Sequence, residues 1–238
     1  MALPVMSAPT YELTVPSTKQ KIKYRPFLVK EEKALLIAQQ SEDETVMLNT
    51  LKDVITACTL GKLDADKIAM FDIEYIFTQL RAKSVGEISE LVFMCKQCND
   101  PKAKMYVDID LTQLKVQFDP AHTSDINLFG NVGIKMKYPD LALLDSLEGG
   151  NVNDVDSIFK IITQCIESIY DEDAVYSANE QTKEELDQFI NNLTQDQFKK
   201  VQAFFETMPK LEKKVEFDCP VCKHHHEHTI RGLTGFFQ

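Results

Sequence analysis

Two short cysteine pairs, Cys95-x2-Cys98 and Cys219-x2-Cys222, constrain the fold of this chain more than any other feature. Each pair follows an apolar run and precedes an alternating one, so each is predicted on the turn of a β-hairpin. Such a turn, which we call a knuckle, holds two thiolates near one metal ion, and two knuckles supply the four ligands that structural zinc prefers. However, 120 residues separate the pairs, against roughly 15–20 in a compact zinc ribbon. A zinc site here would be a split one.

Three interpretations of the four cysteines remain open. Structural Zn2+ is favoured, because lysines such as Lys102 and Lys223 lie near the two pairs and cations help to keep thiols ionised. A redox dithiol at Cys219-Pro220-Val221-Cys222 is the second, but such cysteines usually begin a helix, whereas 223–229 is predicted as strand or loop. Cysteines without metal are the third.

Histidines bear on whether the two pairs share one ion. His224, His225, His226 and His228 lie beside the second pair, whereas the nearest histidine to the first pair is His122. A separate site at the first pair would therefore lack ligands, which favours one shared site of four cysteines. The histidine cluster itself is predicted to be a solvated loop, with auxiliary metal ligation as the alternative.

The pattern along the chain predicts an α+β fold with a helical middle flanked by β-hairpins. Four segments are expected within one compact unit: an N-terminal hairpin and helices (1–87), the first knuckle hairpin (88–118), a strand and helical block (119–209), and the second knuckle hairpin with an aromatic tail (210–238). Tyr11 to Tyr24 alternates as a hairpin should. Apolar spacing predicts a helix from Val155 to Ile169.

Short sequence motifs predict where several helices start, and the C-terminal tail carries two adjacent aromatic residues. Capping boxes, in which a Ser or Thr and a residue three positions later satisfy each other's backbone donors, are predicted at Ser41, Thr182 and Thr194. The tail carries Phe236 and Phe237, which are expected either to pack in the core or to dock on a partner.

Composition excludes several classes of function. With 26 basic and 37 acidic residues the net charge is -11, which argues against non-specific binding to nucleic acid or anionic membranes. No apolar run reaches the roughly 20 residues of a membrane span, and the first ten residues lack a signal-peptide pattern. An intracellular protein is therefore expected.

The sequence contains little that indicates a catalytic site. The chain has no serine elbow, no paired Cys/His nucleophile and no phosphate-binding fingerprint, so we expect no enzyme and no small-molecule substrate. Cys58 and Cys165 fall on apolar helical faces and are predicted to be buried small hydrophobes.

Several runs together resemble the baseplate hub assembly proteins of T-even-like bacteriophages. They are Lys21 to Lys33, Phe71 to Phe77, the first knuckle, and Phe217 to Cys222 followed by the tail Gly232 to Phe237. The resemblance implies a non-enzymatic role in building the hub of a contractile-tail baseplate inside the infected bacterium. It is compatible both with a component of the finished virion and with an assembly chaperone.

The leading hypothesis is a zinc-stapled α+β protein that binds other baseplate and tail hub proteins. Its metal ligands would be Cys95, Cys98, Cys219 and Cys222. The alternative from a different class is a zinc-ribbon transcription regulator that contacts nucleic acid or polymerase.

Overall fold

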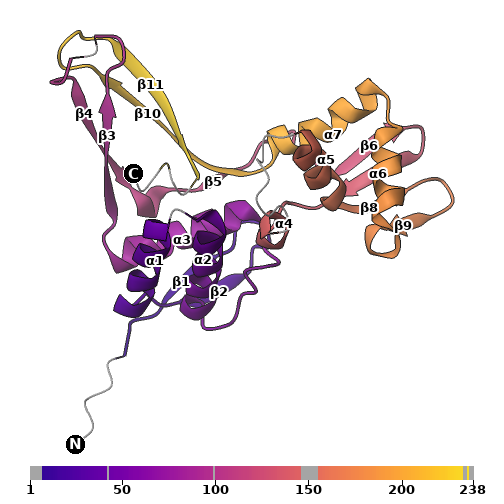
Figure 1. Ribbon diagram of the computed structural model, residues 1–238, viewed down its shortest axis with the longest axis horizontal. Coiled ribbons are helices and arrows are strands. Elements are labelled where there is room, and N and C mark those ends of the chain that lie inside the picture. The colour runs from indigo at the N-terminus through magenta and orange to yellow at the C-terminus, as the bar shows by residue number, and fades with distance from the viewer. Residues whose placement is uncertain (1–6, 42, 99, 146–154, 233–234, 236–238) are drawn as a thin grey trace, which may run out of the picture. The chain divides into compact units, whose positions relative to one another are not determined.

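The computed structural model in Figure 1 describes all residues except 1–6, 42, 99, 146–154, 233–234 and 236–238. The aromatic pair of the tail, Phe236 and Phe237, therefore lies outside the described residues. Contacts divide the chain into two compact units. Unit 1 combines Met1–Gln117 with Lys210–Gln238, and unit 2 is the continuous segment Phe118–Pro209.

Helices and antiparallel sheets alternate through both units, which confirms the α+β class. Among the described residues, none of the helices has the length and the apolar stretch that a bilayer crossing requires.

Unit 1 begins with the predicted hairpin and continues with three helices. The strands β1 and β2 pair antiparallel, with Leu13 opposite Ile22; both of these side chains are buried. The elements are β1 (Tyr11–Thr14), β2 (Lys21–Tyr24), α1 (Val29–Ser41), α2 (Glu44–Cys58) and α3 (Met70–Ser84).

The predicted capping box at Ser41 is wrong. Ser41 is the last residue of α1, and its hydroxyl donates to the carbonyl of Ala38 at 2.7 Å. Asp43 caps α2 instead, because its carboxylate accepts from the backbone N–H groups of Thr45 and Val46 at 2.9 and 3.3 Å. A carboxylate at this position also interacts favourably with the positive end of the helix dipole.

Two long hairpins complete unit 1 and carry the two knuckles at their tips, as predicted. We call them ribbon 1, formed by β3 (Ile88–Met94) and β4 (Lys104–Asp110), and ribbon 2, formed by β10 (Lys210–Asp218) and β11 (His225–Arg231). Figure 1 shows the ribbons side by side, with both turns at the same end. After the short 3-10 helix Leu111–Gln113, strand β5 (Val116–Gln117) pairs with the start of β10 and so ties the two ribbons together at their base.

Unit 2 is a four-stranded antiparallel sheet with helices packed against it. The strands are β6 (Asp125–Phe129), β7 (Val132–Met136), β8 (Ile166–Tyr170) and β9 (Val175–Ser177), in that order across the sheet. The helices are α4 (Leu141–Asp145), α5 (Val155–Gln164), α6 (Lys183–Asn191) and α7 (Gln195–Thr207), with a 3-10 turn at Ala178–Glu180. The predicted capping boxes at Thr182 and Thr194 are both present.

The predicted helix from Val155 to Ile169 is wrong in its second half. Helix α5 ends at Gln164, and Ile166 to Tyr170 form the strand β8. Isoleucines spaced by three and four suit a helix, but β-branched residues also favour strands. Pairing decides between the two, since β8 lies between β7 and β9 and satisfies its backbone on both sides.

Candidate metal centre

The two knuckles bring all four predicted cysteines together. The ligand atoms of Cys95, Cys98, Cys219 and Cys222 lie within 4.8 Å of one another. Cys95 Sγ is 3.7 Å from Cys222 Sγ, and Cys98 Sγ is 3.8 Å from Cys219 Sγ. A tetrahedral ion with metal–sulfur bonds of about 2.3 Å places its sulfurs roughly 3.8 Å apart. The spacing therefore fits a four-thiolate metal site and is far too long for disulfides, whose sulfurs are about 2.05 Å apart.

Backbone hydrogen bonds hold each knuckle in this shape. At the first, the N–H of Cys95 donates to the carbonyl of Ala103 at 3.1 Å. At the second, the N–H of Cys219 donates to the carbonyl of His224 at 2.9 Å, and the N–H of Lys223 donates back to the carbonyl of Cys219 at 3.0 Å. Lys223 has a φ of 61°, in the left-handed region that reverses the chain sharply.

Packing encloses the inner side of the cluster and leaves the tip open. Cys95 and Cys219 are buried together with Ala103 and Met105, whereas Cys222 is exposed. Just below the cluster, Phe93 of ribbon 1 stacks on Phe217 of ribbon 2 with ring centroids 4.9 Å apart. The knuckles are thus built at the end of a small apolar contact between the ribbons.

The thiols influence one another strongly. Desolvation opposes the ionisation of Cys219, but the backbone N–H groups of Cys222 and Val221 outweigh it and lower the pKa of Cys219 to about 7. A backbone hydrogen bond favours ionised Cys222, but desolvation and the three neighbouring thiols together raise its pKa to about 12. Four thiolates this close repel one another, and a divalent cation relieves that repulsion.

His226 contacts the cysteine cluster, which the sequence interpretation did not favour. Its Nε2 lies 3.2 Å from Cys95 Sγ, and its ring stacks on Phe217 with centroids 5.7 Å apart. The predicted solvated loop is wrong for this residue, because His225–Arg231 is the strand β11. Strand alternation is the signal that identifies it: positions 226, 228 and 230 share the face that turns toward ribbon 1, where His228 meets the edge of Phe93.

The remaining two cysteines are buried, as predicted, but Cys165 lies in the turn between α5 and β8 rather than on a helical face. Cys58 and Cys165 each have 0 % exposure. Burial raises the pKa of Cys58 to about 11 and that of Cys165 to about 12. Both stay protonated near neutral pH and therefore lack the thiolate that nucleophilic chemistry needs.

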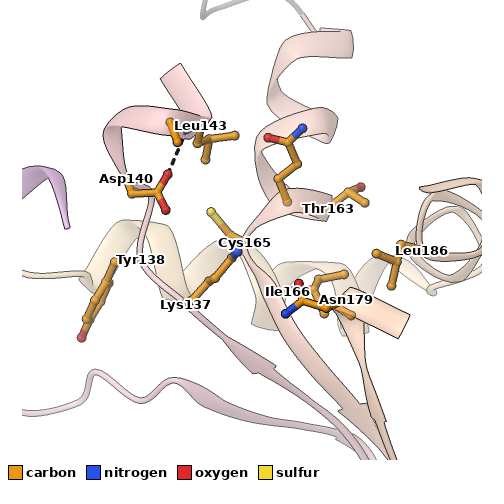
Figure 2. A pocket seen from close by; sticks show the side chains of 12 residues that line it. Lys137, Tyr138, Asp140, Leu143, Thr163, Cys165, Ile166, Asn179 and Leu186 are labelled. Carbon is orange, nitrogen blue, oxygen red and sulfur yellow. Dashed lines mark hydrogen bonds between the residues drawn. The ribbon is translucent and has the colours of Figure 1, made fainter. Parts of the chain in front are cut away.

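Cys165 also lines a cavity of about 320 Å³ in unit 2, shown in Figure 2. Lys137 and Asn179 bring polar groups to its wall, and Leu143 and Ile166 bring apolar ones. The carboxylate of Asp140 accepts a hydrogen bond from the backbone N–H of Leu143 at 2.9 Å, so it is engaged at the start of α4. Among the residues that line the cavity, the structure shows no nucleophile that is hydrogen-bonded to a base.

Sequence comparison places the whole chain in one family. The sequence model of the T4 bacteriophage base plate protein family matches residues 8–238. The match extends through the N-terminal hairpin, both ribbons and unit 2. The chain belongs to this family.

A curated relative sharpens the assignment. The chain is 24% identical over 230 residues to the baseplate hub assembly protein gp26 of Enterobacteria phage T4. The aligned region covers 96% of this chain and 98% of the relative. The resemblance inferred from the sequence runs is thereby confirmed. No solved structure matches the chain significantly.

Proposed function

We propose that this protein assists the assembly of a phage baseplate hub by binding other hub proteins, and that a structural Zn2+ ion holds its two ribbons together. The observation that carries the assembly role is the near end-to-end match to the hub assembly protein of phage T4. The role is exercised in the cytoplasm of the infected bacterium, and it requires no catalysis.

The zinc proposal rests on the donor set and its geometry. Four thiols at tetrahedral spacing, two of them buried, form the ligand set typical of closed structural sites. When bound, the ion supplies folding free energy, on the order of 10–16 kcal/mol in small zinc peptides at neutral pH. Here it joins Cys95 to Cys222, and so joins the two segments of the chain that form unit 1.

The alternative of a transcription regulator is not favoured, because the family match names baseplate proteins. A net charge of -11 also opposes binding to nucleic acid. A dithiol oxidoreductase is the remaining alternative for the cysteines; it predicts insulin reduction that is lost in Cys219→Ser.

The assembly role is tested in cells infected with a phage that lacks this protein. We expect electron microscopy to show no complete baseplates and no tails, and the wild-type protein supplied in trans to restore both. Normal tails in its absence would overturn the proposal. Mass spectrometry of purified tails then separates a virion component, which is present, from an assembly chaperone, which is absent.

The metal is tested on the purified protein. We expect elemental analysis to find one zinc per chain, and a Cys222→Ser variant to bind much less. Replacement by Co2+ gives a visible spectrum that distinguishes four sulfur ligands from three sulfurs and the His226 imidazole. Far less than one zinc per chain would exclude the structural site.

A further inference from the structure

The outer face of ribbon 1 differs from that of every other strand pair in unit 1. Side chains alternate along a strand, and the inward set of ribbon 1 includes Phe93, which stacks on ribbon 2. We call the opposite set the outer face. Its eight residues form four cross-strand pairs: Ile88 with Asp110, Glu90 with Asp108, Val92 with Tyr106, and Met94 with Lys104.

Half of this face is apolar and exposed. Val92 and Tyr106 lie opposite each other with 51% and 62% of their surface exposed, and Met94 and Ile88 expose 49% and 54%. A ribbon face that only meets water normally carries polar residues. Exposed apolar side chains gathered on one face mark an interaction site.

Ribbon 2 provides the comparison within the same molecule. Its outer face pairs polar or charged residues throughout: Glu212 with Arg231, Lys214 with Thr229, Glu216 with Glu227, and Asp218 with His225. Both ribbons consist of seven cross-strand pairs and end in a Cys-x2-Cys knuckle. The apolar residues on ribbon 1 are therefore not a requirement of the architecture.

Charge on the outer face indicates what kind of partner it fits. Glu90 lies directly opposite Asp108, and like charges in this position destabilise a strand pair. Within the part of the chain that the structure describes, neither carboxylate forms an ion pair. Asp110 follows on the same face, with Lys83 of α3 nearby. Ribbon 2 also has a like-charged pair, Glu216 opposite Glu227, but its neighbour His225, which pairs with Asp218 at 2.8 Å, supplies a group that can carry positive charge there.

We propose that the outer face of ribbon 1 docks a segment of another baseplate protein that presents a Lys or Arg beside apolar side chains. The cation would neutralise Glu90 and Asp108, and the apolar residues would cover Val92 and Tyr106. A two-fold interface centred on this pair would bring the acids of two copies together, which disfavours a second copy of this chain as the partner. This inference rests on the proposed assembly role and names the surface that carries it.

The test measures binding of purified variants to the hub subcomplex isolated from cells infected with a phage that lacks this protein. Tyr at the centre of an interface is frequently a hot spot, and its truncation weakens binding by about 30-fold or more. We expect Tyr106→Ser to show a loss of that order and Val92→Thr a smaller one. Val175→Thr is the matched control, since Val175 is equally a strand residue, 71% exposed, but lies on β9 of unit 2.

The charges are tested with amide variants of almost the same shape, which protects the fold. We expect Glu90→Gln with Asp108→Asn to weaken binding and to flatten its dependence on salt, because ion pairs across an interface are screened. The control is Glu216→Gln with Glu227→Gln on ribbon 2, which should bind like the wild type. Zinc content and thermal unfolding show whether each variant is folded.

The outcomes separate the two proposals. If the wild-type protein fails to bind the subcomplex, the assembly role fails and this inference falls with it. If the wild type binds and the folded outer-face variants bind equally well, or the controls lose as much affinity, the assembly role stands and the docking surface is elsewhere. Selective loss in the outer-face variants supports the proposal.

Discussion

Unit 2 and the ribbon tips of unit 1 are stabilised in different ways. Unit 2 is a continuous segment, and twelve buried residues of its described part form one core, among them Ile134, Val201 and Phe204. The ribbon tips of unit 1 come from distant parts of the chain, and four of their described residues are buried in the cluster, two of which are the cysteines Cys95 and Cys219. Where apolar burial is this limited, a cross-link must contribute much of the stability.

The comparison predicts that metal removal affects one unit and not the other. Chelation of the metal, or Cys95→Ser, should release the knuckles and cost unit 1 several kcal/mol, on the scale of structural zinc sites. Hydrogen exchange should then rise in β3, β4, β10 and β11, whereas the sheet of unit 2 keeps its protection. Cys165→Ala, a buried cysteine in unit 2, should retain the zinc. Equal loss of protection in both units would show that the metal stabilises unit 2 as well as unit 1.

The reverse experiment uses the core of unit 2. Phe204 is 2% exposed and its ring lies 5.1 Å from that of His122 and 5.6 Å from that of Tyr138. Phe204→Ala leaves a cavity and should cost about 3–5 kcal/mol. Calorimetry should show an earlier unfolding transition, while zinc content stays at one per chain. Loss of zinc in this variant would mean that unit 2 governs the metal centre.

A smaller effect is expected from Glu74, on α3 of unit 1. Burial raises the pKa of its carboxyl from 4.5 to about 7. The folded protein therefore holds a proton that the unfolded chain releases near pH 4.5, so stability falls as pH rises from about 4.5 to about 7. Glu74→Gln should remove this loss and stabilise the protein by about 2 kcal/mol at pH 8.

Denaturation at pH 5 and pH 8 measures the change. The exposed residue Glu32 on α1 supplies the control, as Glu32→Gln should leave the pH dependence unaltered. A wild-type stability that does not change over this range would show that Glu74 is not desolvated as described. This measurement concerns the helical part of unit 1 and not its knuckles, because Glu74 lies on α3.

The smallest expected effect is at the start of α6. The hydroxyl of Thr182 accepts from the N–H of Glu185, and the Glu185 carboxylate accepts from the N–H of Thr182 at 2.8 Å. Thr182→Ala should cost about 1 kcal/mol. Chemical denaturation followed in unit 2 measures it, with Ser157→Ala, inside α5, as a reference. A cost above about 3 kcal/mol would assign Thr182 a role beyond capping.

Much of the metal centre could be predicted from the sequence because its parts are local. A Cys-x2-Cys turn between two apolar runs specifies a hairpin within some twenty residues, and the knuckles at Cys95 and Cys219 lie where expected. The outer face of ribbon 1 was equally present in the alternation of Ile88, Glu90 and Val92. Its significance required the comparison with ribbon 2, which the register of the strands made possible.

Local patterns in the sequence are thus enough to establish the α+β class, the two hairpins, the burial of Cys58 and Cys165 and the family to which the chain belongs. Only the tertiary structure decided that Cys95 meets Cys222, that His226 reaches Cys95, and that Ile166 to Tyr170 form a strand. The physical reason is the same in each case. Local pattern sets what a segment prefers, but a partner far away in the chain supplies the hydrogen bonds and contacts that select one conformation.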